Sequence, residues 1–423
     1  MNIKNNKSIM KKCFIIAIAA LAAVSACTKV DPVNTVTKDT AISFSVINHL
    51  HQTRATEGLT YPTTVPFGTF AWWTAGEWDQ ETAPQEFVFM NNEEIKYKQL
   101  EASGPYVWAP ASAYYWTKSG KLTFASYSPY VKEINDETKA AKGFSAIPAH
   151  DPALGFQFVD YTIVDNTNVD LMYANLAKDC TQDTNTDGTA VTDSSNPEGG
   201  FKGVPTIFNH ALCQVAFAFR AIGNKNPNVE DIKIIIKEVK IANIDKKGTF
   251  TQNPATNGAA RWASTHATGN YTNYSYLTPE GNPQTNAVEL SFIDLGVTPT
   301  AVSATDNYTG IGDARILLPQ TLAVTTDTNN APVDPTPNTV TDQKLIVDYT
   351  IKTKYASSTE WATEEVTSVA RLKTSNMVAW ADNQNILYRI SIYPNAAVPV
   401  TFDPAVVSWT DVYSNIDIIA HND

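Results

Sequence analysis

The sequence has few of the residues that enzymes and disulfide-rich folds depend on. Its 423 residues include four cysteines and six histidines, and the histidines are scattered along the chain. No nucleophile elbow, zinc-protease motif or phosphate-binding loop occurs. We therefore expect no enzyme, no catalytic residue and no cofactor, although the two distant carboxylates of a β-sandwich glycosidase would leave no local motif.

Positive charge and long apolar runs are also scarce. The formal net charge is −12, with 31 Lys and Arg against 43 Asp and Glu, which makes nucleic acid an unexpected partner. Beyond residue 27 no apolar run reaches the roughly 20 residues of a transmembrane helix. Hydrophobic residues still make up 43% of the chain, enough for the cores of two or three domains.

The one long apolar segment lies at the N-terminus, in residues 13–24, and is preceded by four lysines and no acid. It has the length of a signal-peptide core, about 7–15 residues, and it ends in small residues. Val24-Ser25-Ala26-Cys27 resembles a lipobox, which implies cleavage before Cys27 and acylation of its thiol. Residues 1–26 are therefore expected to be a lipoprotein signal peptide; an ordinary secretory signal with an incidental cysteine is the alternative.

Cys180 and Cys213 remain once Cys13 leaves with the signal and Cys27 carries lipid. These two cysteines could form a single disulfide or remain as two buried thiols. Cys213 lies in an apolar, strand-like run and Cys180 beside a polar loop, which favours the thiols.

Apolar and polar residues alternate with a period of two along most of the chain, which predicts β-strands. In residues 41–47 the apolar members are Ile42, Phe44 and Val46. The same period recurs in residues 122–127, 215–219, 232–236, 345–351 and 386–392. Long amphipathic helical patterns are scarce, and 23 prolines and 19 glycines supply turns, so an all-β fold of antiparallel β-sandwiches is expected.

Two polar stretches interrupt the alternation: residues 179–200, a domain boundary, and residues 325–341, a surface loop. In the first, Asp183, Asn185 and Asp187 precede a glycine with the spacing of a calcium loop. The twelfth position is a serine instead of the bidentate glutamate. A solvated turn is therefore favoured over a calcium site, and no metal is expected.

Aromatic residues gather in residues 72–78, 106–108 and 114–116. A row of exposed rings would suit glycan stacking. Their strand-like spacing favours the core of the first sandwich instead, because each large ring buries roughly 150–250 Å².

Several short segments in order resemble the fimbrillin family, the subunits of lipoprotein-derived type V pili of Gram-negative bacteria. The resemblance runs nearly end to end. After the lipobox its segments are Thr53-Arg54-Ala55, Val107-Trp108-Ala109-Pro110, Tyr115-Trp116, residues 121–129, 170–174, 208–212, 247–250 and 317–320, and residues 400–409.

The resemblance implies two transthyretin-like antiparallel β-sandwich domains, residues 55–203 and 204–396. Residues 27–54 would be a lipid tether with a removable first strand, and residues 397–423 a donor-strand tail. Lipid would hold the chain at the outer membrane until an arginine-specific surface protease cuts it and it joins a surface pilus. Other fimbrillin subunits, in a homo- or heteropolymer, are the implied partners.

Arg54-Ala55 is the candidate cleavage bond. Cutting there would release the Cys27 anchor and free Ile42, Phe44 and Val46 from the first sheet. Arg54 as an ordinary loop arginine is the alternative, and Lys29 and Lys38 are further basic sites nearer the anchor.

The tail would fill the gap that a removed strand leaves in a neighbouring subunit, where unpaired backbone groups and an apolar groove are exposed. A last strand paired within its own domain is the alternative. The expected function is a structural and adhesive pilus subunit that polymerises by protease-triggered donor-strand exchange; the alternative is a monomeric surface lipoprotein adhesin that binds glycan or a host ligand. The expected donor side chains are Val398, Val400, Phe402, Val406, Trp409, Val412, Ile416 and Ile418.

Overall fold

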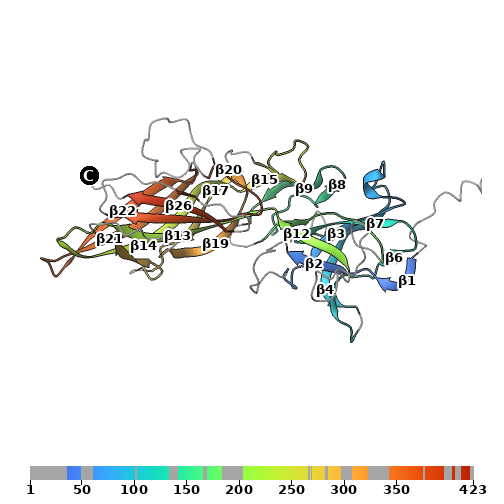
Figure 1. The fold of residues 1–423 in the computed structure, drawn as a ribbon, viewed down its shortest axis with the longest axis horizontal. Coiled ribbons are helices and arrows are strands. Elements are labelled where there is room, and N and C mark those ends of the chain that lie inside the picture. Colours follow the sequence, from blue (N-terminus) through green and yellow to red (C-terminus); the bar gives the residue numbers. More distant parts are fainter. Residues whose placement is uncertain are drawn as a thin grey trace, which may run out of the picture.

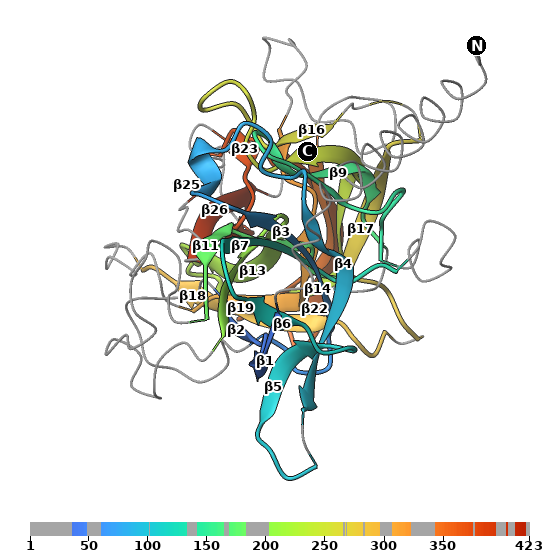
Figure 2. The same ribbon diagram turned by 90° about the vertical axis from the view of Figure 1, so that its right-hand side faces the viewer.

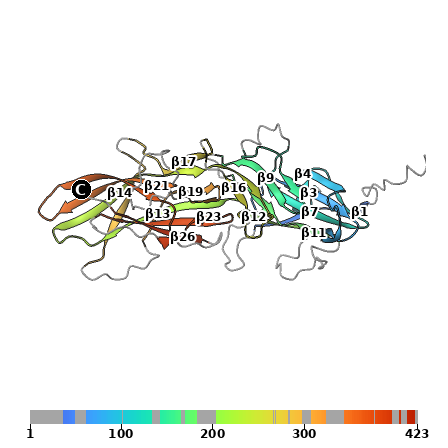
Figure 3. The same ribbon diagram turned by 90° about the horizontal axis from the view of Figure 1, so that it is seen from above.

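In the computed structural model, the described elements are β-strands apart from one short 3-10 turn, and they form two bodies end to end along the long axis (Figures 1 and 3). The all-β class is confirmed, whereas the transthyretin-like layout stays a prediction. In the described part of the chain, no helix combines the length and hydrophobicity needed to cross a membrane. The described residues are 36–48, 61–100, 102–132, 142–164, 169–182, 203–264, 267, 269–281, 284–296, 307–322, 343–374, 377–394, 403–404 and 411–419; for 36–40, 47–48, 403–404 and 411–419 only the backbone is described.

The first body is built on an eight-stranded sheet with the order β10-β12-β2-β5-β4-β3-β7-β11. The 3-10 turn η2 (Trp78–Gln80) lies between β3 and β4, and β1 (Val36–Ala41) pairs with β6 (Tyr115–Thr117) in a sheet of their own. The eight strands are β2 (Phe44–Asn48), β3 (Phe67–Thr74), β4 (Val88–Gln99), β5 (Tyr106–Pro110), β7 (Lys121–Ser128), β10 (Met172–Ala174), β11 (Ala177–Cys180) and β12 (Val204–His210).

A four-stranded sheet, in the order β16-β15-β9-β8, links the two bodies. It joins β8 (Ala149–Asp151) and β9 (Gly155–Thr162) to β15 (Lys247–Thr251) and β16 (Trp262–Ser264). Phe250 of β15 is fully buried opposite Phe158 of β9, with the ring centroids 5.4 Å apart, and lies 5.1 Å from Tyr173 of β10. One hydrophobic core therefore continues from the first body into the second.

The second body is a ten-stranded sheet in the order β22-β21-β14-β18-β13-β24-β26-β25, with β17 on β14 and β19 on β13. A short sheet pairs β20 (Gln320–Thr321) with β23 (Ala379–Trp380). The ten strands are β13 (Cys213–Gly223), β14 (Val229–Asp245), β17 (Tyr271–Leu277), β18 (Val288–Asp294), β19 (Thr309–Leu317), β21 (Lys344–Tyr355), β22 (Trp361–Arg371), β24 (Asn385–Tyr393), β25 (Asp403–Pro404) and β26 (Asp411–Ile419).

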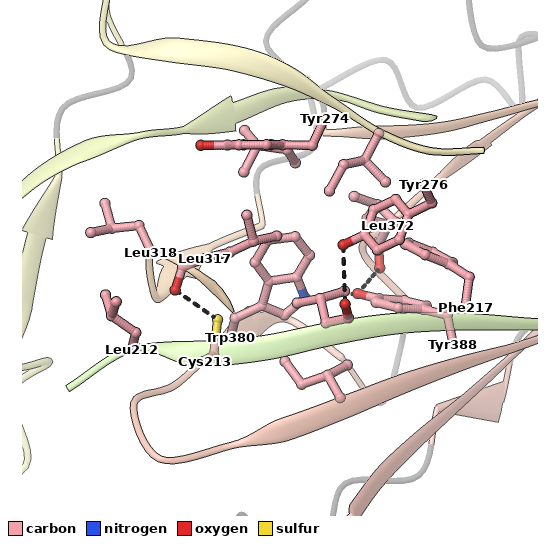
Figure 4. Packing of buried hydrophobic residues seen from close by; sticks show 14 of the residues in the cluster. Leu212, Cys213, Phe217, Tyr274, Tyr276, Leu317, Leu318, Leu372, Trp380 and Tyr388 are labelled. Atoms are coloured by element: carbon pink, nitrogen blue, oxygen red, sulfur yellow. Dashed lines mark hydrogen bonds between the residues drawn. The ribbon is translucent and has the colours of Figure 1, made fainter. Parts of the chain in front are cut away.

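Three polar groups in the core of the second body have partners within it (Figure 4). The Trp380 indole donates to the Tyr388 hydroxyl at 2.8 Å, and the Tyr276 hydroxyl donates to the Val215 carbonyl at 3.1 Å. The Cys213 thiol lies 3.4 Å from the Leu317 carbonyl, and burial raises its pKa. Pairing of this kind removes the cost of burying polar groups in an apolar interior.

The cysteines of the two bodies are not bridged. Cys180 and Cys213 are both buried and neither forms a disulfide, so the disulfide alternative is wrong and the expectation of two buried thiols is confirmed.

Five of the six alternating segments lie within strands: β7, β13, β14, β21 and β24. The sixth, residues 41–47, runs from the last residue of β1 into β2, with Ile42 and Ser43 between the two strands. Most pairings are antiparallel, but β12 with β2, β18 and β24 with β13, and β26 with β24 are parallel. Alternation reports which face is buried and carries no information on strand direction.

The boundary expected at residue 203 stays a prediction. β12 follows it in the sequence but completes the first sheet beside β10 and β2, and β15 reaches back to pair with β9. Both contacts tie the second half of the chain to the first.

Because Phe250 belongs to the core shared by both bodies, we expect Phe250→Ala to lower the free energy of unfolding by about 3–5 kcal/mol. Calorimetry should show the melting of both bodies shifted downwards. Val159→Ala, at a half-exposed position of neighbouring β9, is the matched control and should change stability by less than about 0.5 kcal/mol. A Phe250→Ala effect as small as the control, or confined to one of two transitions, would contradict a shared core.

Candidate functional site

The most N-terminal strand of the first sheet lies in its interior. β2 pairs in parallel with β12 over five positions, from Phe44 opposite Val204 to Asn48 opposite Phe208, and in antiparallel with β5 at Phe44 opposite Trp108. At its start the Val204 amide donates to the Ser43 carbonyl at 2.7 Å. Removing β2 would unpair the inner edge of β12 over five positions and that of β5 at Trp108, in the middle of a sheet.

The side chains of this first strand point to the core. Ile42 and Phe44 are buried, and half-buried Val46 packs against the same cluster, as the alternation predicts. The Phe44 ring meets Phe67 and Phe124 edge to face, with centroids 5.7 Å from each. At about 1.5–3 kcal/mol for each fully buried apolar side chain, this strand contributes several kcal/mol to the first sheet.

Removal of β2 would expose a groove lined by aromatic rings from segments that are distant in sequence. Phe67, Trp108 and Phe208 surround Tyr61, whose ring stacks on Phe208 at a centroid distance of 5.0 Å. The Tyr61 hydroxyl is 2.7 Å from Ser128 Oγ. Without β2 the groove would be a preformed apolar slot between two free strand edges.

Gly203 permits the close approach of β2 to β12. A Cβ atom there would lie 2.6 Å from the Ser43 carbonyl oxygen, far inside van der Waals contact. Sequence analysis missed this glycine because nothing in its local pattern marks it: it follows the polar stretch and precedes a strand, as many turn glycines do.

Most of the tryptophans that suggested a glycan platform are buried. Trp72, Trp78, Trp108 and Trp116 each expose 7% or less of their surface, which confirms the core interpretation.

A surface cavity of about 560 Å³ lies beside β3, β4 and β8 of the first body. Its residues include Phe70, Trp72 and His150, and Gln85 Nε2 lies 2.9 Å from His150 Nδ1. Burial lowers the pKa of His150 to about 4, so the ring is neutral at physiological pH. The indole of Trp72 is 4% exposed, so this tryptophan offers little surface to the cavity.

Several sequence-predicted sites lie outside the described residues: Cys27, Arg54, Ala55, the calcium-like Asp183, Asn185 and Asp187, and Val398, Val400, Phe402, Val406 and Trp409 of the tail. Among the residues that are described, no three His, Cys, Asp or Glu side chains are grouped to hold a metal ion.

The end of the tail is a strand of its own sheet. β26 pairs in parallel with β24 from Asn385 opposite Asp411 to Tyr393 opposite Ile419, and β25 pairs with β26. Only the backbone of Val412, Ile416 and Ile418 is described. This matches the alternative of a last strand within its own domain, and a donor role in an assembled state stays a prediction.

Comparison with known proteins identifies the class. The family model described as fimbrillin-like matches residues 53–409. The chain belongs to the fimbrillin-like family, and is therefore a cell-surface subunit of the fimbrial and adhesion type.

The chain also shows low structural similarity to solved structures. A fimbrial protein from Bacteroides vulgatus shares 20% identity at a TM-score of 0.47, covering 89% of this chain and 98% of the other. A candidate cell adhesion protein from Bacteroides uniformis shares 15% identity at a TM-score of 0.35, covering 89% and 98%. Neither TM-score is high enough to support a functional conclusion. No curated protein matched the chain.

Because Phe44 is buried among aromatic rings inside the sheet, Phe44→Ala in the chain from residue 28 onwards should lower the free energy of unfolding by about 3–5 kcal/mol. Ser45→Ala is the matched control, since neighbouring strand residues face opposite sides of a sheet and Ser45 points away from the groove. Chemical denaturation would measure both. Equal, small effects would mean that β2 is not held in the sheet.

Proposed function

We propose that this chain is a pilus subunit that polymerises by donor-strand exchange, in which a strand of a neighbouring subunit replaces β2 between β12 and β5. The observation that carries the proposal is the interior position of β2. A cut after β2 removes β2 and the preceding β1, which belongs to a separate two-stranded sheet, and leaves the other seven strands of the eight-stranded sheet in place. The loss of β2 creates a slot that another strand can fill.

Cleavage supplies the trigger. While β2 is covalently attached, its effective concentration at the slot far exceeds that of any separate chain, so a donor cannot compete. The proposed cut at Arg54-Ala55, by an arginine-specific surface protease, makes the strand a separate peptide. The same cut detaches the subunit from the lipid on Cys27 that is proposed to hold it at the outer membrane.

The C-terminal tail is the proposed donor. β26 lies beside β24, which is already paired with β13 on its other side, so departure of the tail exposes one edge and leaves the remaining sheet paired. In an extended strand Val412, Ile416 and Ile418 share one face. Each such side chain buried in the slot contributes about 1.5–3 kcal/mol before ordering costs.

We expect Arg54→Ala to leave the chain full length and unpolymerised, because β2 then stays attached in its slot. Immunoblots should show no trimming, and radioactive palmitate, which would label the proposed lipid on Cys27, should stay with the protein. Lys38→Ala, which removes another basic site before β2 ends, is the control and should be trimmed normally. Trimming of Arg54→Ala at the wild-type rate would move the cleavage site to another residue.

Removal of residues 412–423 should give a trimmed, folded monomer that melts near the intact monomer but forms no polymer. Ile416→Asp should also block assembly, because an unpaired carboxylate in an apolar slot costs several kcal/mol. Asn415→Asp adds the same charge on the opposite face of the strand and should assemble. Size-exclusion chromatography and denaturant-resistant ladders would report the outcome, and fibres from the truncated chain would mean that another segment is the donor.

A further inference from the structure

Two stacked tyrosines are exposed on the hairpin formed by β4 and β5. Tyr97 exposes 40% and Tyr106 56% of their surfaces, and the rings stack with centroids 5.4 Å apart and an interplanar angle of 28°. Figure 2 shows this hairpin reaching away from the body of the molecule. Leu100, near the hairpin turn, is 43% exposed, so the tip offers apolar surface to solvent.

The two rings belong to the same face as the groove beneath β2. Tyr97 is opposite Trp108 and Gln99 is opposite Tyr106, so both tyrosines continue the row that begins at buried Ile95. The Tyr97 ring lies 5.4 Å from Trp108, and Trp108 lies 5.2 Å from Tyr61 in the groove. One aromatic row therefore runs from solvent into the proposed slot.

β2 pairs with only a short part of the backbone edge of β5. Within the described residues β2 pairs with β12 at five positions but with β5 at one, Phe44 opposite Trp108. Continuing that antiparallel register would bring Val46 opposite Tyr106, yet the ladder has already stopped. A replacement strand that continued this register past Trp108 would pair with backbone groups of β5 that β2 does not reach in the described residues, beside an apolar face.

The hairpin holds this shape without a partner. Gln99 Nε2 donates to the Gly104 carbonyl at 2.8 Å, and Lys98 Nζ donates to the Ala111 carbonyl at 3.0 Å. Five consecutive residues of β5 pair with β4, from Tyr106 opposite Gln99 to Pro110 opposite Ile95. The surface is therefore preformed, which lowers the ordering cost of binding.

From these observations we infer that the face formed by Tyr97 and Tyr106 extends the slot, and that its occupant is a strand of a second copy of this chain, which pairs with β5 past Trp108 and covers both rings. The inference rests on the proposed function and adds a contact that β2 does not make. The donor strand makes this contact when it binds, whereas β2 makes no such contact that would be lost when it leaves. The contact therefore favours the donor strand over β2 as the occupant of the slot. A sugar would use the rings but not the adjoining strand edge, so the geometry favours a strand.

Thiol labelling tests the inference directly. Tyr106→Cys in the trimmed subunit places an exposed thiol on the face, while Cys180 and Cys213 are buried and Cys27 is absent from that form. We expect a maleimide to label the monomer readily and the polymer at least tenfold more slowly. Tyr355→Cys, at a 43% exposed position at the end of β21 in the second body, is the matched control and should react equally in both. Equal labelling of Tyr106→Cys in monomer and polymer would overturn the inference while leaving the proposed function intact.

A second variant separates the remaining outcomes. Tyr97→Ser combined with Tyr106→Ser should melt like the parent as a monomer, because both rings are exposed, but its polymer should dissociate in mild denaturant at least tenfold faster. Tyr355→Ser should behave like the parent. Wild-type polymer stability in the double variant, together with loss of saturable glycan binding, would overturn the inference in favour of a sugar platform. Failure of the parent subunit itself to polymerise would overturn the proposed function, and the inference with it.

Discussion

The first body depends on a strand that supplies hydrogen-bond partners to the facing edges of β12 and β5. Each is paired on its outer side, β12 with β10 and β5 with β4, and each needs a strand on its inner side. β2 meets that demand along β12 and, on β5, at Phe44 opposite Trp108, and the ring of Phe44, the first residue of β2, packs edge to face against Phe67 and Phe124. The requirement is for an extended backbone with apolar side chains on one face and not for a particular connection to the rest of the chain. Because the sheet does not require that this strand belong to the same chain, a strand of another subunit can replace it.

The two bodies are joined by more than a linker. β9 and β15 pair directly, Phe250 packs among rings of the first body, and the Arg261 guanidinium lies 2.7 Å from Asp382 of the second. The Trp262 indole also donates to the Ala211 carbonyl, where the chain passes from β12 to β13. Interfaces between domains are often small and polar enough to permit relative motion, but a shared apolar core of this kind does not.

Alternation in the sequence predicted strands and their buried face wherever one face is in the core and the other is exposed or half covered, as in β12 and β24. Ile42, Phe44 and Val46 illustrate this, and so do the tryptophans, whose burial follows from their size. The pattern could not predict that β7 is buried on both faces. Alternation could not predict that β2 pairs in parallel with β12, because parallel and antiparallel strands bury their side chains alike. Nor could it find Gly203, whose role depends on a carbonyl 160 residues earlier in the chain, at Ser43. Tyr97 and Trp108 lie directly opposite each other in the hairpin, yet Tyr97 is exposed and Trp108 is buried. Trp108 also pairs with Phe44 of β2, a long-range contact that no local pattern records.

The linking sheet has a mechanical consequence. The bodies lie end to end, so tension applied along the molecule must pass through the region where β9 and β15 are hydrogen bonded (Figure 3). A flexible tether there would stretch under small loads and let successive subunits swivel. Paired strands backed by packed aromatic rings instead resist extension until several hydrogen bonds rupture together. Within each subunit of a filament, the two bodies would therefore bend and stretch little relative to each other.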